Sequence, residues 1–297
     1  MLKIALVGYG NIGRYALKAL EAAGDMECCG VVRRSGSAQG CSELAPYRVV
    51  RDPRELGSVD AAILGVPSRL VEQTASQYLA LGISTVDSFD IHPEIADLRA
   101  RLDSLARANG AAAVISAGWD PGSDSVVRAL LRSLSPEGTT YTNFGPGRSM
   151  GHTVAAKAVP GVKDALSVTI PEGKGVHSRK VYVELGEGAD FATVAAAIKA
   201  DPYFVSDRTD VEQVADVPAL NTLMHGVDLE REGRSSQVDG QKFDFRMRIN
   251  NPALTGQVLV SAARAVCRQA PGCYTMIEIP VIDFLEGDRE NLIKEIV

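Results

Sequence analysis

The sequence predicts an α/β protein with two domains. The first domain is expected to have a Rossmann-type, doubly wound parallel sheet, and the second to be an α+β domain with a largely antiparallel sheet. Three observations support this prediction. Short apolar runs alternate with helical segments over residues 1–118, a glycine motif follows the first apolar run, and apolar and polar residues alternate later in the chain. At 297 residues, the chain is also near the upper limit for a single hydrophobic core.

The strands expected in the first domain are short apolar runs without clean alternation, as in parallel sheets that helices cover on both faces. They are Lys3–Val7, Glu27–Val32, Ala61–Val66, Ser84–Asp87 and Ala112–Ser116. The helices expected between and after them are Arg14–Ala23, Ser68–Leu81, Pro93–Ala108 and Gly122–Ser133. This order of elements favours a dinucleotide-binding domain over residues 1–118.

The pattern changes after residue 118. A glycine-rich loop is expected at Gly145–Gly151, and alternation predicts antiparallel strands with one solvent-exposed face. These strands are Ala165–Ile170, His177–Leu185 and Lys242–Ile249, and the helices expected here are Phe191–Ala200 and Ala253–Gln269. We therefore expect a second domain over residues 119–252. The C-terminal segment, from about residue 253 to residue 297, is expected to pack back towards the first domain.

Composition and charge exclude several classes of function. Lys and Arg number 31 against 37 Asp and Glu, for a net charge of −6 without a dense basic run, so nucleic acid is not an expected partner. A membrane span needs about 18 consecutive apolar residues, and no stretch of the sequence is that long. The first apolar run is too short for a signal peptide. The five cysteines have no C-x-x-C spacing and the four histidines no H-x-x-x-H pair. We expect a cytoplasmic protein with reduced thiols, no membrane partner and no metal site.

A glycine motif joins the first expected strand to the first expected helix. Gly8, Gly10 and Gly13 have the spacing G-x-G-x-x-G, which allows a tight turn, close approach of a pyrophosphate and packing of helix on strand. The first N–H groups of the helix would face the phosphates. A turn that merely joins strand and helix is the alternative. The residues expected to bind a nucleotide are Gly8, Tyr9, Gly10, Asn11, Ile12 and Gly13.

The residues after the second expected strand indicate which nucleotide binds. An NAD enzyme usually has Asp or Glu there, whereas this chain has Arg33, Arg34 and Ser35. Guanidinium groups bind a 2′-phosphate through charge-assisted hydrogen bonds, and a carboxylate would repel it. The sequence therefore favours NADP(H) over NAD, although two exposed arginines in a solvated loop would give the same pattern.

Carboxylates end two of the expected strands, near the place where a Rossmann enzyme binds its substrate. They are Asp87 or Asp90 in the first segment and Asp120 in the second. Such groups can hold a substrate ammonium and help to remove its proton. The alternative is that Asp90 and Asp120 cap the helices that follow them. Because the chain has no Tyr-x-x-x-Lys pattern and no set of zinc ligands, short-chain and zinc-dependent dehydrogenases are excluded.

Several motifs together resemble the meso-diaminopimelate dehydrogenase family, in its shorter-chain branch. Besides the glycine motif and the arginine pair, they are Val86–Asp90, Gly118–Gly122, Phe144–Gly147, Ser149–His152 and Arg246–Pro252, in order along essentially the whole chain. The resemblance implies an NADP-dependent homodimer whose second domain binds substrate and forms the dimer. It also implies that the D-centre of meso-2,6-diaminopimelate is oxidatively deaminated to L-2-amino-6-oxopimelate, ammonia and NADPH, or formed by the reverse reaction for lysine and cell-wall synthesis.

The resemblance also implies a set of site residues. Asp90 and Asp120 would contact the amine of the reacting D-centre. Trp119, Phe144, Met150 and Gly151 would shape the pocket around that amine, and Thr169, Arg179, His225 and Asn251 would meet the distal L-centre and the carboxylates. A substrate with two ammonium and two carboxylate groups needs both signs of charge in its site.

Four other functions remain as alternatives. Residues 202–240 are short and match the family less clearly, which suggests its shorter branch. The resemblance to that branch implies less strictness about the amino acid, so a relaxed D-amino acid dehydrogenase is one alternative. A reductase of the dihydrodipicolinate type, with the same two-domain plan, is another. Gly147–Gly151 fits the spacing G-x-S-x-G, so Ser149 could be a hydrolase nucleophile, but that motif needs a strand before it and a helix after it. A nicotinamide-sensing regulator would have no need for the carboxylates.

Overall fold

The computed structural model describes residues 1–220 and 225–297, and for Met150 and Gly151 it describes the backbone alone. The chain divides into two compact units: unit 1 consists of Met1–Ala129 and Asn251–Val297, and unit 2 of Leu130–Asn250. The division falls within helix α4 (Ser123–Leu134), eleven residues after the boundary expected at residue 118.

Unit 1 is built on a seven-stranded sheet, in which all neighbouring strands are parallel. Its order is β14-β6-β5-β4-β1-β2-β3, so successive strands run outwards in both directions from the pair β1 and β4. Ligands of such sheets bind beyond the carboxyl ends of the strands where the order reverses. The strands are β1 (Leu2–Val7), β2 (Met26–Val32), β3 (Val49–Val50), β4 (Ala61–Leu64), β5 (Ser84–Asp87), β6 (Ala112–Ile115) and β14 (Gly272–Thr275).

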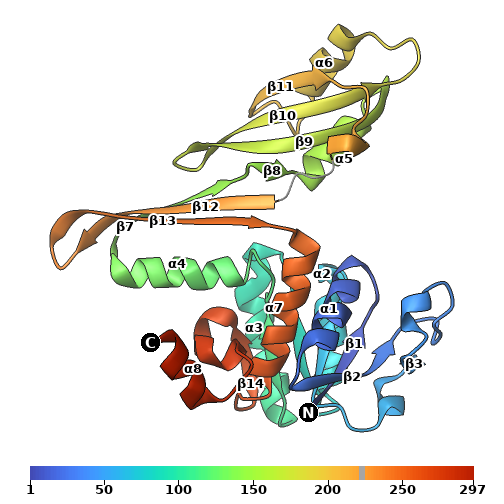
Figure 1. The fold of residues 1–297 in the computed structure, drawn as a ribbon, viewed down its shortest axis with the longest axis vertical. Helices are drawn as coiled ribbons and strands as arrows, with labels where there is room; N and C mark the ends of the chain where they lie inside the picture. The colour runs from blue at the N-terminus through green and yellow to red at the C-terminus, as the bar shows by residue number, and fades with distance from the viewer. Residues whose placement is uncertain (221–224) are drawn as a thin grey trace. The chain divides into compact units, whose positions relative to one another are not determined.

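Helices cover both faces of this sheet, as the parallel, apolar strands require. Alternate residues of β1 enter two separate cores: Ile4 and Leu6 pack with α1 and α7, and Ala5 and Val7 pack with α2 and α3. Helix α7 lies along α1 (Figure 1), and at Gly256 the approach is so close that a Cβ would lie 2.7 Å from the backbone nitrogen of Ala16. The helices are α1 (Asn11–Ala22), α2 (Ser68–Leu79), α3 (Ile95–Ala108), α7 (Asn251–Val266) and α8 (Arg289–Ile296).

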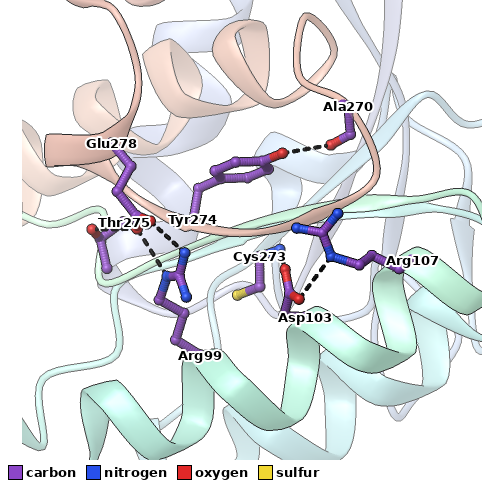
Figure 2. A network of polar contacts seen from close by, with 8 residues as sticks. All are labelled: Arg99, Asp103, Arg107, Ala270, Cys273, Tyr274, Thr275 and Glu278. Carbon is purple, nitrogen blue, oxygen red and sulfur yellow. Dashed lines mark hydrogen bonds and ion pairs between the residues drawn. The ribbon is translucent and has the colours of Figure 1, made fainter.

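The C-terminal segment adds β14 to the edge of the sheet, beside β6, a strand that the sequence analysis did not predict. Polar contacts with α3 hold it there (Figure 2): the backbone N–H of Cys273 donates to Asp103 Oδ1 at 2.9 Å, and Arg99 Nε donates to Glu278 Oε2 at 2.9 Å. The 3₁₀ helices of unit 1 are η1 (Ser42–Leu44), η2 (Pro53–Leu56), η3 (His92–Glu94), η5 (Met276–Glu278) and η6 (Val281–Phe284). Across the residues that the structure describes, no helix combines the length and the apolar character that a membrane crossing needs.

Unit 2 contains two sheets with mainly antiparallel pairing, in agreement with the predicted fold class. The first has the order β11-β10-β9-β8, with β10 and β11 parallel, and the second has the order β13-β12-β7. Helices α5 and α6 pack on one face of the first sheet, around Phe204 and Ile198. The elements are β7 (Glu137–Phe144), β8 (Gly147–Arg148), α5 (Met150–Lys157), β9 (Val162–Gly173), β10 (Val176–Leu185), α6 (Phe191–Ala200), β11 (Arg208–Gln213), η4 (Pro218–Leu220), β12 (His225–Ser235) and β13 (Val238–Ile249).

The prediction of a continuous loop over Gly145–Gly151 is wrong. Gly147 and Arg148 pair with Thr169 and Val168 as the short strand β8, and α5 begins at Met150. The sequence missed these elements because β8 has only two residues and because glycine usually interrupts regular structure.

Candidate active site

The glycine loop between β1 and α1 has the geometry that a dinucleotide requires. Gly8 has φ +86°, and a Cβ on Gly8 would lie 2.5 Å from the carbonyl oxygen of Gly65. A Cβ on Gly13 would lie 2.6 Å from the carbonyl oxygen of Gly8, whereas open space surrounds the position of a Cβ on Gly10. Helix α1 starts there without a side-chain cap or an acidic residue in its first turn. The loop is therefore closed on its inner side and open to an anion at the helix start.

A cleft of about 590 Å³ adjoins this loop within unit 1, a size typical of cofactor sites. Arg33, Arg34 and Ser35 line it at the end of β2, and Arg51, at the end of β3, lines it as well. Backbone carbonyl oxygens orient two of these arginines. Arg33 Nη1 donates to the carbonyl oxygen of Ser37 at 2.9 Å, and Arg51 Nε donates to that of Ser35 at 3.4 Å. The cleft therefore offers several cations for one phosphate group.

The expected cofactor residues thus occupy one end of unit 1. Gly8, Tyr9, Arg33, Arg34 and Ser35 line the cleft, and Gly10, Asn11, Ile12 and Gly13 form the adjoining turn and the start of α1. Arg51 was not among the residues expected from the sequence. It follows β3 as Arg33 follows β2, so recognition of the two-residue strand Val49–Val50 would have pointed to it.

Asp87 and Asp90, which the sequence left as alternatives, have different surroundings. Asp87 is fully buried, and its Oδ1 accepts hydrogen bonds from the backbone N–H groups of Phe89 at 2.9 Å and Ser116 at 3.2 Å. Burial raises the pKa of Asp87 to about 6, and these two hydrogen bonds oppose the shift. Asp87 therefore fastens the loop after β5 to the end of β6.

Asp90 is exposed, at the edge of an open cleft of about 740 Å³. Its Oδ1 accepts a hydrogen bond from the hydroxyl of Ser68, the first residue of α2, at 2.6 Å. The alternative that Asp90 caps a helix is wrong, because the cap position of η3 is Ile91 and that of α3 is Glu94. Asp90 is therefore the carboxylate of this segment that a ligand can reach.

The segment Gly118–Gly122 folds back on itself and presents Trp119 and Asp120. The N–H of Gly118 donates to the carbonyl oxygen of Pro121 at 3.0 Å, and the N–H of Ser123 donates to that of Gly118 at 3.0 Å. Gly122 has φ +143°, and a Cβ on it would lie 1.9 Å from the carbonyl oxygen of Gly118, so only glycine fits. This closed turn leads from Asp120 into α4, which begins at Ser123.

The side chain of Asp120 is only 9% exposed and is paired with Arg128 of α4. The Arg128 nitrogens Nη1 and Nη2 lie 3.3 and 3.4 Å from Asp120 Oδ1. Asp120 lies three residues before the first residue of α4, and its carboxylate contacts a side chain of that helix. It is thus a carboxylate held by one cation and placed at the carboxyl end of the sheet.

In unit 2, a polar network surrounds Arg179 on β10. Arg179 Nε donates to Asp207 Oδ2 at 2.6 Å, and Nη1 donates to the hydroxyl of Thr169 on β9. His152 of α5 places its Nε2 3.8 Å from the same Asp207 oxygen, and its Nδ1 lies 2.9 Å from Ser149 Oγ. The structure therefore brings Thr169 and Arg179 together, and Asp207 and His152 are members of the network that the sequence analysis missed.

Ser149 lies between β8 and α5, so the local order of elements resembles that of a nucleophile elbow. The backbone of Ser149 is ordinary extended chain, with φ −110° and ψ 111°, whereas an elbow serine sits on a sharp, strained turn. Asp207, which would have to orient His152, is bound more closely by Arg179. The geometry favours a network that fixes Arg179 over a hydrolase triad.

Phe144 ends β7 and is oriented by a histidine. Its backbone N–H donates to His177 Nε2 at 2.9 Å, and the two rings lie 6.0 Å apart between centroids. This hydrogen bond requires Nε2 without a proton. Burial lowers the pKa of His177, and Arg179 lowers it further, which keeps the ring neutral. His177 was expected on a strand but not at the site.

The remaining expected residues belong to both units. His225 begins β12 and is half-buried, and burial together with Arg148 lowers its pKa. Asn251 begins α7 in unit 1, and its Oδ1 accepts a hydrogen bond from Thr255 at 3.1 Å. The side chains expected at positions 150 and 151 lie outside the described residues. Within the described chain, no group of three or more His, Cys, Asp and Glu side chains is placed to hold a metal ion.

The chain is similar to known proteins over its full length. Residues 118–251 match the family model of the diaminopimelic acid dehydrogenase C-terminal domain. The chain is 60% identical over 296 residues to the meso-diaminopimelate D-dehydrogenase of Bacteroides fragilis, covering 100% of this chain and 99% of that protein. The solved Corynebacterium glutamicum DAP dehydrogenase in complex with DAP has a TM-score of 0.80 at 25% identity, covering 100% and 99% of the two chains.

A further solved structure is an engineered D-amino acid dehydrogenase bound to NADP⁺, with a TM-score of 0.73 at 25% identity and coverage of 100% of this chain and 99% of that chain. Similarity therefore extends over both units and includes one protein in complex with DAP and one bound to NADP⁺. On the identity with the Bacteroides fragilis enzyme over the full length, this chain belongs to the family of meso-diaminopimelate D-dehydrogenases.

Proposed function

We propose that the protein catalyses the NADP-dependent oxidative deamination of the D-centre of meso-2,6-diaminopimelate, reversible as a reductive amination. Substrate, NADP⁺ and water would give L-2-amino-6-oxopimelate, ammonium, NADPH and one proton. The observation that carries this proposal is the 60% identity over the full chain to a meso-diaminopimelate D-dehydrogenase. The substrate has two ammonium and two carboxylate groups, and the chain offers carboxylates in unit 1, at Asp90 and Asp120, and a guanidinium in unit 2, at Arg179.

The cleft beside the glycine loop is the proposed site of NADP(H). The pyrophosphate would lie at the start of α1, where Gly10 leaves open space. Arg33, Arg34 and Arg51 would meet the 2′-phosphate, a group that NAD lacks. When bound, the nicotinamide accepts the hydride from the D-centre carbon.

Asp90 and Asp120 are the proposed partners of the reacting amine. Hydride can leave the carbon only when its nitrogen is neutral and has a lone pair, so the ammonium must first lose a proton to a carboxylate or to water. Asp120 is nearly buried and held by Arg128, which fixes its position, whereas Asp90 is exposed and oriented by Ser68. Both would also attract the ammonium by charge.

The distal end of the substrate is assigned to the network around Arg179. A guanidinium bound by Asp207 and Thr169 is held in one orientation, which suits a carboxylate. We propose His225 and Asn251 as further distal partners. Trp119, Phe144, Met150 and Gly151 are the proposed pocket around the reacting centre. Polar groups that the wrong stereoisomer would leave unpaired give the strongest discrimination.

The rate of NADP⁺ reduction with the meso, LL and DD isomers of diaminopimelate tests the proposal. We expect turnover with the meso isomer, less with the DD isomer and none with the LL isomer, because only a D-centre can react. D-alanine and D-lysine are tested as further substrates. If D-alanine were turned over as fast as the meso isomer, the result would favour a relaxed D-amino acid dehydrogenase. Absence of turnover with every isomer, in a protein that binds NADPH, would overturn the proposal.

Family membership also leads us to propose a homodimer in the cytoplasm. Light scattering of the purified protein should give twice the mass of one chain. A monomer that turns over the meso isomer at full rate would reject the dimer and leave the catalytic proposal intact.

A further inference from the structure

A second carboxyl group lies beside Asp120. Asp124, in the first turn of α4, has a side chain with 0% exposure, against 9% for Asp120. One guanidinium contacts both: Arg128 Nη1 lies 3.3 Å from Asp120 Oδ1, and Arg128 Nη2 lies 2.8 Å from Asp124 Oδ2. If both carboxyl groups were ionised, two buried negative charges would share one positive charge.

The surroundings of Asp124 favour its neutral form. Among the described residues, Arg128 and the backbone N–H of Ser125 are the donors beside Asp124, and neither makes a hydrogen bond of regular geometry to its oxygens. A buried carboxylate normally accepts several such bonds. Burial raises the pKa of Asp124 to about 8, the charge of Asp120 acts in the same direction, and Arg128 and the backbone N–H of Ser125 act in the opposite one. Among the described residues, the charged groups that act on Asp124 are thus Asp120, from the turn before α4, and Arg128, from the same helix.

The side chains of Asp124 and Asp120 share a hydrogen bond, and one of the two must be its donor. A hydrogen bond between two carboxyl groups needs a proton on one of them, and the more buried group is the one that retains it. A neutral Asp124 therefore donates, and an ionised Asp120 accepts. Asp120 keeps the single negative charge of the pair, as a partner of an ammonium requires.

We propose that Asp124 is a positioning residue, which keeps one proton and donates a hydrogen bond to Asp120, so that the carboxylate proposed to meet the substrate amine is held ionised and in one orientation. This inference rests on the proposed function of Asp120. Because its side chain is fully buried, Asp124 acts through Asp120 and not on the substrate. When Asp124 ionises, Asp120 loses its donor and gains a like charge beside it.

Two variants separate the hydrogen bond from the proton. Asp124→Asn keeps a donor that cannot ionise, and Asp124→Ala removes the donor. At about pH 7 we expect kcat/KM for meso-diaminopimelate to stay within about threefold of the wild type in Asp124→Asn and to fall about tenfold or more in Asp124→Ala, as for a lost hydrogen bond to a charged group. Asp97→Asn is the matched control, because Asp97 also lies in the first turn of a helix but is exposed.

The pH profile distinguishes this role from a merely structural one. The ratio of kcat/KM between Asp124→Asn and the wild type cancels the ionisations of substrate and cofactor, which both enzymes share. We expect the ratio to be constant below about pH 7 and to rise through one ionisation near pH 8, where the wild type loses its proton. A ratio that is flat from about pH 6 to about pH 10 would overturn the positioning role, as would full activity of Asp124→Ala.

Infrared difference spectra of the ligand-free protein provide a readout without activity. The wild type and Asp97→Asn should show the C=O stretch of a protonated carboxyl group at about pH 7, lost with a midpoint near pH 8, and Asp124→Asn should lack it. Absence of the band in the wild type overturns the proposal, even where the isomer assay supports the proposed function. A band in a protein that oxidises no isomer rejects the proposed function instead, and with it the role of Asp124 in positioning.

Discussion

The cofactor end of unit 1 and the arginine network of unit 2 position their polar groups in opposite ways. At the cofactor end, backbone geometry dominates: Gly8 and Gly13 fit because no Cβ intrudes, and the arginines follow strand ends at one edge of the sheet. In the network, side chains from three elements and the segment before β11 fix one another around Arg179. A site of the first kind leaves a short sequence motif, and a site of the second kind leaves none.

The difference also concerns charge. In unit 1, buried carboxyl groups have raised pKa values, as at Asp87 and Asp124, whereas in unit 2 the pKa values of the histidines His152, His177 and His225 are lowered. In both units burial favours the neutral form. A fall in pH should therefore stabilise the folded state at the buried carboxyl groups of unit 1 and destabilise it at the histidines of unit 2. We also expect substitutions in the two units to change different kinetic parameters.

The largest effect is expected at Asp120, the carboxylate of unit 1 that we propose to meet the reacting amine. Asp120→Asn keeps the shape of the side chain and removes its charge, so we expect turnover of the meso isomer to fall about 10²- to 10⁴-fold, the range for loss of a general base. NADPH binding, followed by fluorescence titration, should stay nearly unchanged. Asp90→Asn, measured alongside, shows which carboxylate matters more. Unchanged turnover in Asp120→Asn would remove this residue from the proposed mechanism.

A smaller effect is expected in unit 2, and on binding more than on turnover. We expect Arg179→Met to reduce kcat/KM for the meso isomer about 10- to 100-fold, mainly through KM, as for a lost charge-assisted hydrogen bond. Asp207→Asn should act in the same direction and less strongly, since Arg179 remains but is no longer fixed. Oxidation of D-lysine, which lacks the distal carboxylate, should change little in either variant.

Asp210→Asn is the control for the network. Asp210 lies on β11, is exposed, and pairs with Lys180 of β10, outside the network around Arg179. A loss with D-lysine as large as that with the meso isomer would mean that Arg179 supports the fold and does not select the substrate.

A still smaller and more selective effect is expected in the cofactor cleft. Replacement of both Arg33 and Arg34 by alanine should weaken NADP⁺ binding about tenfold or more and leave NAD⁺ binding nearly unchanged, because only NADP⁺ has a 2′-phosphate. Titration calorimetry with the two cofactors measures this difference. Arg54→Ala is a control, since Arg54 is exposed and paired with Asp52. Equal losses for both cofactors would contradict the assignment of the phosphate.

The smallest effect concerns pH and compares the units directly. A histidine with a lowered folded pKa contributes its full stability above the unfolded value of 6.5 and loses it as the pH falls below that value. Asp87 has the opposite sign, because its raised pKa favours the folded state as the pH falls from about 6 towards 3.8. Between about pH 7 and about pH 5.5, hydrogen exchange should therefore lose more protection in β9 and β10 than in β1 and β4. Equal losses in the two units would contradict this.

The fold of unit 1 was predictable because its strands are continuous apolar runs. Ile4, Leu6, Ala5 and Val7 all face a core, so β1 is apolar throughout. The strands β7 and β12 were not predicted, since much of each is polar and only single side chains such as Val227 and Leu229 are buried. Strand β3 has two residues, too few for any periodicity.

The candidate site was predictable where function depends on position along a strand or turn. Asp120 follows β6 closely, and Gly8 and Arg33 follow β1 and β2, so a pattern along the sequence pointed to all three. Partners that act across elements gave no such signal. Asp207 precedes an unpredicted strand, and Asp124 differs from an ordinary helix-start aspartate only in its burial, which the fold determines.

The most direct test of the account follows the hydride. Deuterium is placed on the D-centre carbon of meso-diaminopimelate in one sample and on the L-centre carbon in another, and the NADPH formed by each is analysed by mass spectrometry. We expect deuterated NADPH and a slower reaction from the first sample, and unlabelled NADPH at the normal rate from the second. Label arriving from the L-centre, or from neither carbon, would contradict it.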